Sequence, residues 1–275
     1  MISSEVLDAI LSPDAGRRSQ AETILQSMSV VQRVQGCMNH LSTTQASSPQ
    51  TQMLAAVLLR RDILKLTDVA MLKELVSPLL SAFSTSASCK QQVGHCLAEI
   101  CAILSFQTNA AETVLPTILS SIEGSLKQGD IASLKLLANL ADRSPVAFSK
   151  IAVPSLPSLV PSSDLSPYAT DAWTEILVNS AIATTVKSAS LIRNTPELDD
   201  LVVDGNSAAS SLGPCLAQVI KNYTSAALTD DEDSLRSCLE HLCNAAVTCP
   251  SLLAGSQPVL EVSVSYTHLT LPTKA

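Results

Sequence analysis

The residues best suited to chemistry in this sequence are its cysteines and histidines, of which it has 8 and 4. Cys96 and Cys101 are five residues apart, as are Cys238 and Cys243. Five residues of a helix turn the side chains through about 500°, which points the two thiols apart. Neither spacing is that of a structural zinc site. We interpret these residues as core thiols, and the alternative is a metal site in which His241 shares a helical face with Cys238.

Other catalytic signatures are missing from the sequence. It has no Gly-rich phosphate loop, no pair of histidines in the zinc-protease spacing and no nucleophile elbow, and its histidines are scattered. The only Trp, Trp173, is most simply a core residue. We therefore expect no catalytic residues, no cofactor, no metal and no enzyme activity. An enzyme with an unfamiliar helical fold would need a pocket with convergent titratable groups.

The composition favours helices packed against helices. Hydrophobic residues make up 46% of the 275 residues but aromatic residues only 3%, so the core must be built from Leu, Ala, Val and Ile. The net charge is −8. Nucleic acid is therefore a poor candidate partner, because phosphate binding requires clustered Lys and Arg. An acidic surface favours basic partners.

The start of the chain, MISSEVLDAI, has acidic residues and lacks the basic segment of a signal peptide. We therefore expect free thiols rather than disulfides, and an intracellular protein. No apolar run approaches the roughly 18 residues needed to span a bilayer, so we also expect a soluble protein without membrane insertion.

Prolines mark an internal repeat. Five prolines lie just before apolar residues in helical segments: Pro78, Pro116, Pro154, Pro214 and Pro258. Most intervals are near the roughly 40–47 residues of a HEAT or armadillo unit. The longer interval before Pro214 indicates an insertion, which we place in the polar stretch 184–211.

Helix start signals lie between these prolines. Ser48-Pro49 and Ser166-Pro167 each place a capping residue before a Pro at the first helical position. Thr229 with Glu232 fits a capping box. The segment 51–66 is apolar almost all round from Met53 to Leu59, which predicts a helix covered on several sides. No segment shows a sustained two-residue alternation, so we expect no sheet.

These patterns predict an all-α fold, a right-handed superhelical solenoid of HEAT-type helix pairs spanning residues 1–264. A helix bundle is the alternative fold, and the regular proline spacing argues against it. The final residues 265–275 break the helical pattern and are interpreted as a non-homologous tail, either an artefact or the end of a genuine short isoform. The array comprises six pairs, at residues 3–27, 30–66, 68–105, 109–142, 146–184 and 199–248, and the start of a seventh near residue 250.

Several segments resemble importin-beta-like nuclear transport receptors (karyopherin beta), most closely the importin-5 and importin-4 branch. The segment ILSPDAGRRSQAETIL resembles the opening of that family, and TQMLAAVLLRRDILKL resembles its second inner helix. VGHCLAEICAIL has the Ala-Glu of the third inner helix, and residues 212–253 resemble a later helix pair with an acidic turn. Residues 105–211 match by helix pattern only. Family members are much longer chains.

The resemblance implies a nuclear import receptor that binds basic cargo proteins and nucleoporin Phe-Gly repeats, and that releases cargo when the GTP-bound form of the small GTPase Ran binds. It implies a monomer that shuttles between cytoplasm and nucleus. A HEAT-repeat scaffold outside nuclear transport, such as a phosphatase regulatory subunit or a tubulin-binding array, remains the alternative function. The Ser- and Asp-rich loops disfavour tubulin binding.

By position, the resemblance places Ran on the inner helices and makes their exposed charged residues candidates. They are Arg60, Arg61, Asp62, Glu99 and Asp142. Alternatively, the two arginines lie at the edge of a buried helix with their charges in solvent, and Glu99 pairs within its own helix. The acidic run 230–233 could attract basic cargo, although we favour its role as a helix cap.

Overall fold

The computed structural model describes seven segments of the chain, and every regular element in them is a helix. The segments are residues 2–42, 48–108, 110–161, 166–185, 212–220, 232–248 and 250–253. Contacts divide the chain into two compact units, Met1–Val114 and Leu115–Ala275. The predicted all-helical character is confirmed, and no strand occurs in the described segments.

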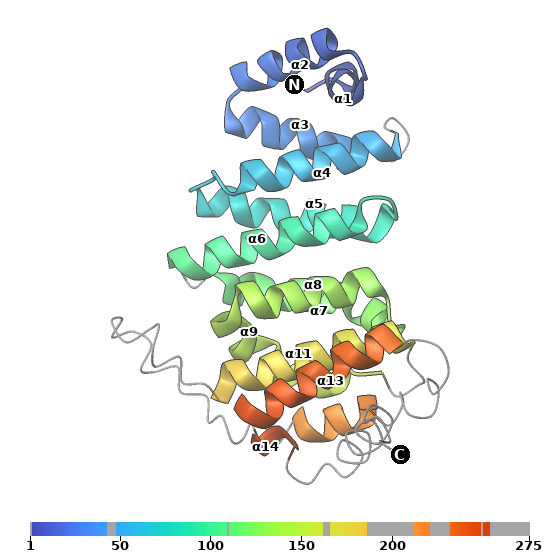
Figure 1. Ribbon diagram of the computed structural model, residues 1–275. Helices are drawn as coiled ribbons and strands as arrows, with labels where there is room; N and C mark the ends of the chain where they lie inside the picture. Colours follow the sequence, from blue (N-terminus) through green and yellow to red (C-terminus); the bar gives the residue numbers. More distant parts are fainter. Residues whose placement is uncertain are drawn as a thin grey trace. The chain divides into compact units, whose positions relative to one another are not determined.

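The first unit contains three consecutive helix pairs, at the places that the sequence predicted (Figure 1). The last helix runs three residues beyond the expected end of its pair. The helices are α1 (Ser4–Leu11), α2 (Ala15–Ser27), α3 (Val30–Ser42), α4 (Pro49–Ile63), α5 (Val69–Thr85) and α6 (Lys90–Thr108).

The second and third pairs of this unit form two layers. Within each pair, α3 packs on α4 and α5 packs on α6. Between the pairs, α3 contacts α5 and α4 contacts α6, so helices in equivalent positions stack on one another. The first pair departs from this pattern, because α1 contacts α4 as well as α2. One pair alone could not bury its apolar face, and stacking supplies the missing cover.

The second unit is built around α11 (Pro167–Thr185), which contacts α8 (Ile131–Arg143), α9 (Pro145–Ile151) and α13 (Glu232–Thr248). The helix α7 (Ala111–Lys127) precedes α8, and α14 (Pro250–Leu253) follows and contacts α13. Residues 212–220 are also helical. Trp173 in α11 and Phe148 in α9 are fully buried, as expected for Trp173.

Prolines shape the first helices of the pairs in two ways. Pro78 lies inside α5 and Pro116 inside α7, where each lacks the N–H that would bond to the preceding turn. In the fifth pair the expected helix from residue 146 is divided into α9, the 3₁₀ turn η1 (Val153–Ser155) and α10 (Leu156–Leu159). Pro154 and Pro157 stand in the first turns of the last two pieces.

Two of the predicted helix starts are confirmed. The Ser48 hydroxyl accepts a hydrogen bond from the Thr51 N–H at 3.1 Å, and Pro49 opens α4. Likewise, α11 begins at Pro167, and the Ser166 hydroxyl accepts from the Ala169 N–H at 3.3 Å.

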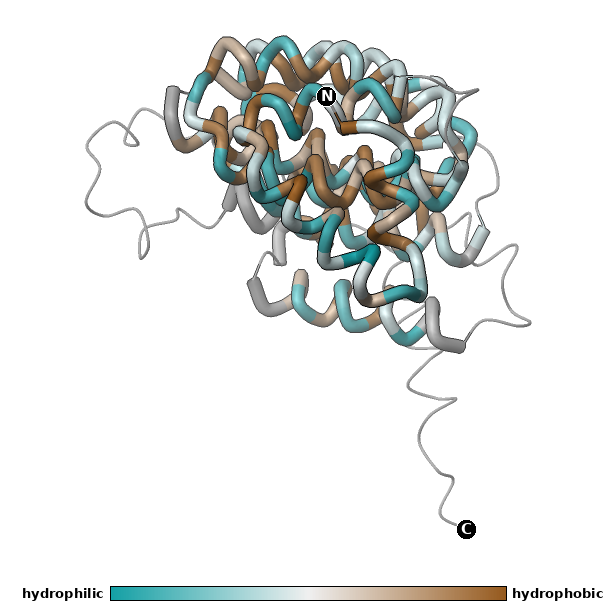
Figure 2. The backbone as a smooth tube through the Cα atoms, turned by 90° about the horizontal axis from the view of Figure 1, so that it is seen from above, coloured by the Kyte–Doolittle hydropathy of each residue, from teal (hydrophilic) through white to brown (hydrophobic). Residues whose placement is uncertain are grey.

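Burial follows one face of most helices. In Figure 2 the hydrophobic residues lie mostly on the sides of the helices that face other helices. The expectation that α4 is covered on several sides is confirmed, because α4 contacts α1, α3 and α6. Met53 and Val57 are nevertheless each 47% exposed, so one side of α4 remains open.

Several predictions fall outside the described residues. They are the capping residue Thr229, the residues 230–231 of the acidic run, most of the stretch 184–211, Pro258, Cys249 and the tail 265–275. In the part of the chain that is described, no helix combines the length and the apolar character that crossing a membrane requires.

Candidate protein-binding surface

The five candidate residues divide into exposed and buried members. Arg61 and Asp142 are exposed, and Arg60 is partly exposed. Asp62 and Glu99 are buried, with exposed fractions of 0% and 4%. The expectation that both of these acids lie on the surface is therefore wrong. Asp142 belongs to the second unit, whereas the other four belong to the first.

The buried Glu99 binds an arginine of the neighbouring pair. Its Oε1 accepts hydrogen bonds from Arg60 Nε at 3.0 Å and from Arg60 Nη2 at 2.8 Å. One partner of Glu99 therefore comes from α4, in the neighbouring helix pair. The Arg60 side chain remains 34% exposed, and its charge pairs with the buried carboxylate of Glu99.

Asp62 is the centre of the second charged group. Its carboxylate accepts from Arg33 Nε at 2.7 Å and from Arg33 Nη2 at 3.0 Å, a two-point pairing between α3 and α4. Arg33 also donates to the carbonyls of Leu25 and Met28 at the end of α2. Burial raises the pKa of Asp62, but the hydrogen bonds and charge of Arg33 prevail and hold this pKa below its ordinary value.

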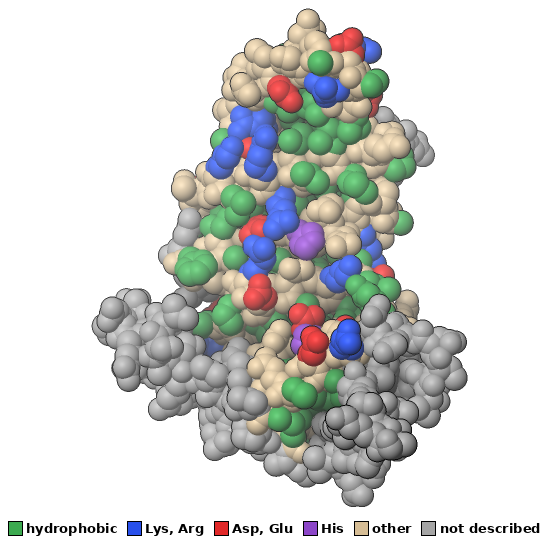
Figure 3. All heavy atoms as spheres, viewed as in Figure 1, with side chains coloured by type: hydrophobic (Ala, Val, Ile, Leu, Met, Phe, Trp, Pro, Cys, Tyr) green, Lys and Arg blue, Asp and Glu red, His purple; other side chains and the backbone are tan. Residues whose placement is uncertain are grey.

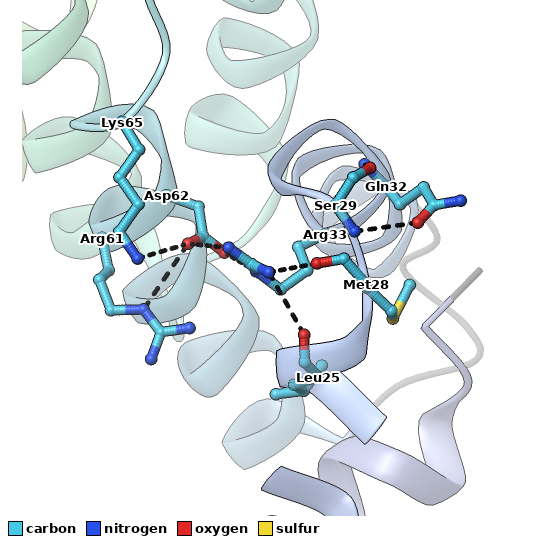
Figure 4. Close-up of polar contacts among 8 residues, drawn as sticks. All are labelled: Leu25, Met28, Ser29, Gln32, Arg33, Arg61, Asp62 and Lys65. Carbon is cyan, nitrogen blue, oxygen red and sulfur yellow. Dashed lines mark hydrogen bonds and ion pairs between the residues drawn. The ribbon is translucent and has the colours of Figure 1, made fainter. Parts of the chain in front are cut away.

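Two further cations approach the same carboxylate from the solvent side. Arg61 Nε lies 3.7 Å and Lys65 Nζ 3.6 Å from Asp62 Oδ1, and both side chains are 53% exposed. Figure 4 shows Arg33, Arg61 and Lys65 converging on Asp62. Three positively charged side chains therefore surround the single negative charge of Asp62. We call Arg33, Arg61 and Lys65 the basic cluster.

A partly exposed apolar face leads along α4 to this cluster. Met53 and Val57 are four residues apart, and Arg61 continues the same line, since residues four apart share a helical face. In the space-filling view, hydrophobic side chains are visible along α4, and Lys and Arg side chains gather near its end (Figure 3).

A pocket of about 520 Å³ opens beside the basic cluster. It lies between the first four helices, and all of its lining belongs to the first unit. The lining combines the three cations of the cluster with apolar side chains and two polar residues. These other residues are Ile10, Leu25, Leu58, Glu22 and Gln26.

The sequence prediction missed Arg33 and Lys65. Lys65 could have been found, because it follows Arg61 by four residues and so shares its face. Arg33 is the only Lys, Arg, Asp or Glu residue in VVQRVQGCMNHLS, but its pairing with Asp62 depends on packing α3 against α4, which that segment does not reveal.

The described cysteines are free thiols, and most are buried as expected. Burial raises the pKa of Cys96 and Cys101 to about 12, which keeps both thiols protonated at neutral pH. Cys243 is exposed, so the prediction that it lies in the core was wrong.

His241 was the candidate for a metal site with Cys238. It approaches Asp171 at 3.8 Å and the Ser237 hydroxyl at 3.5 Å. Within the described segments, no three His, Cys, Asp or Glu side chains are grouped to hold a metal ion.

Comparisons with models of known protein families, with curated proteins and with solved structures found no match to this chain.

Proposed function

We propose that this chain is the amino-terminal part of an importin-beta-like nuclear transport receptor with HEAT-type repeats in a right-handed superhelix. In this proposal it binds basic cargo and nucleoporin Phe-Gly repeats as a monomer and releases cargo when GTP-bound Ran binds. It shuttles between cytoplasm and nucleus and performs no catalysis. The resemblance of residues 10–25 and 51–66 to that family supports the proposal.

The observation that carries the protein-binding part is the open side of α4. A helix in a stack normally buries its apolar residues, yet Met53 and Val57 are nearly half exposed here. Exposed apolar side chains rimmed by charged groups are typical of protein interfaces. Arg61 stands at the end of this face, where the family resemblance places Ran.

The test is binding of the full chain to Ran loaded with GTP or with GDP, at one moderate salt concentration. We expect clear preference for the GTP form. We also expect Arg61→Glu to weaken that binding about tenfold or more, because a charge reversal at an interface removes one attraction and adds one repulsion.

Lys73→Glu is the matched control, because Lys73 is an exposed lysine of α5 and does not line the pocket. Arg60 is unsuitable for reversal, since Arg60→Glu would set a second acid beside the buried Glu99. Equal binding of the two nucleotide forms would contradict the transport function. Unchanged binding by Arg61→Glu would remove Arg61 from the proposed Ran contact.

A protein-binding scaffold outside nuclear transport is the second candidate. It is favoured by the sign of the exposed charge near α4, which is positive and would repel basic cargo at this place. Retained binding of other proteins without any preference for GTP-bound Ran would select this candidate.

A further inference from the structure

The basic cluster has more positive charge than its own fold requires. The two oxygens of Asp62 are already engaged by Arg33 at 2.7 and 3.0 Å. Arg61 and Lys65 approach only to 3.7 and 3.6 Å, longer than a hydrogen bond, and half of each side chain is in solvent. Both can therefore turn to another anion without breaking the pair that joins α3 to α4.

The pocket beside these cations is partly apolar. Leu25 and Leu58 line it together with Arg61 and Lys65. Its acidic residue, Glu22, comes from α2, whereas Arg61 and Lys65 come from the α4 side. An acidic ligand would therefore direct its carboxylates towards α4 and away from α2, while an apolar side chain fills the space between them.

The open face of α4 continues the combination of apolar surface and positive charge beyond the pocket. Met53 and Val57 form an exposed apolar line that ends at Arg61. A ligand that follows this line meets apolar surface first and positive charge afterwards. A peptide with apolar side chains followed by carboxylates would match this order, because its apolar side chains would contact Met53 and Val57 and its carboxylates would reach Arg61.

We propose that the pocket and the exposed face of α4 bind an acidic, apolar segment of a partner protein, whose carboxylates pair with Arg61 and Lys65. The ligand goes beyond the proposed function, because it is neither basic cargo nor a GTPase, although its site shares Arg61 and the open face of α4 with the Ran contact proposed above. Nucleic acid fits the site less well, since the chain has a net charge of −8 and the pocket walls include leucines.

The test uses the full chain and a fluorescent synthetic peptide in which Leu residues alternate with pairs of Glu, followed by fluorescence anisotropy. Two control peptides replace every Glu by Gln or every Leu by Ser. We expect both replacements to weaken binding about tenfold or more, and added salt to weaken binding of the Glu peptide. A short single-stranded DNA is measured in parallel.

Variants assign the effect to the site. We expect Arg61→Glu with Lys65→Glu to lower affinity about tenfold or more, and Lys73→Glu to leave it within about twofold. Arg33 stays unchanged in all variants because it holds Asp62 in the fold. If the double reversal lowers thermal stability, Arg61→Gln with Lys65→Gln replaces it, and we expect at least about a fivefold loss.

Three results would overturn the proposal: equal affinity for the Glu and Gln peptides, equal loss in Lys73→Glu and in the double variant, or binding of the DNA as tight as that of the Glu peptide. The result is separable from the Ran test. Binding of the acidic peptide without binding of Ran would support this site and contradict the transport function. Binding of Ran without binding of the peptide would support the transport function and contradict this site.

Discussion

At the scale of single residues, Asp62 forms an ion pair that joins α3 to α4, the two helices of the second pair. Its carboxylate has no exposed area and is paired at two points with Arg33, which itself binds two carbonyls at the end of α2. Removing one partner of such a pair leaves the other charge buried and uncompensated, which costs more than the pair contributes when intact.

We expect Asp62→Asn to lower the free energy of unfolding at neutral pH by about 3–5 kcal/mol, measured by urea unfolding. The double replacement Arg33→Met with Asp62→Leu should recover much of this loss, because it removes both charges and keeps apolar volume. A double variant less stable than Asp62→Asn would show that the charges are not the cause.

The same residue predicts a pH dependence. The pKa of Asp62 in the folded chain is below its ordinary value of 3.8. A lowered folded pKa means that the stabilisation is complete above the unfolded value and is lost as the pH falls towards the folded value. We expect unfolding measurements below about pH 4 to show a steeper loss of stability for the natural sequence than for Asp62→Asn. Parallel pH profiles would contradict this.

A glycine fixes the approach of the chain start to α3. A Cβ placed on Gly36 would lie 2.7 Å from Ile2 Cγ1 and 3.0 Å from the Ile2 backbone nitrogen. Ile2 is buried, and its carbonyl lies 3.1 Å from His40 Nε2.

We expect Gly36→Ala to destabilise the chain by about 1–3 kcal/mol, because residue 2 must move. Gly124→Ala is the matched control: its Cβ meets nothing within 4 Å, and Ala in a helix should stabilise by about 0.5–1 kcal/mol. Thermal unfolding of both variants is the measurement. Equal shifts in melting temperature for the two variants would contradict the expected clash at Gly36.

At the scale of elements, start signals locate the helices. The Ser48 hydroxyl caps α4 at the Thr51 N–H, and Asp14, Asp68 and Asp130 cap α2, α5 and α8 in the same way. We expect Ser48→Ala to cost about 1 kcal/mol in urea unfolding. Ser77→Ala, on the exposed side of α5, is the control and should change stability by less than about 0.5 kcal/mol. A cost as large at Ser77 would refute the capping role.

Helix positions were predictable because capping residues, prolines and apolar periodicity are local signals. The pairs 30–66 and 68–105 were found for this reason. The division of the fifth pair at Pro154 and Pro157 was missed, since a proline can lie inside a helix, as Pro78 does, or interrupt it. Which occurs depends on packing that the sequence does not reveal.

The candidate site was predictable only in part. Arg60 and Arg61 were chosen for their place on the helix, but the burial of Asp62 and Glu99 depends on cations from other helices. A charged residue in an apolar sequence was interpreted as exposed, because an isolated buried charge is unfavourable. Here partners distant in sequence compensate for burial, 29 residues away for Asp62 and 39 for Glu99.

At the scale of the whole molecule, the two compact units predict unfolding in separable steps. Stacked helix pairs are stabilised by their neighbours, so a change in one unit acts mainly on the pairs near it. Trp173, the only Trp, is fully buried in the second unit, and its fluorescence reports that unit alone. Helical circular dichroism reports both.

We expect Asp62→Asn to shift only part of the dichroism transition in urea and to leave the Trp173 fluorescence midpoint nearly unchanged. Coincident transitions by both probes, shifted equally by the substitution, would show one cooperative unit instead.

The uneven exposure of the cysteines has a practical consequence for labelling. Deep burial keeps Cys37, Cys96 and Cys101 protonated far above neutral pH, and a protonated, enclosed thiol does not react with maleimides. Among the described thiols Cys243 alone is exposed. It therefore offers a natural attachment point on α13 for a dye. A dye there would share the second unit with Trp173, at the far end of the sequence from the basic cluster.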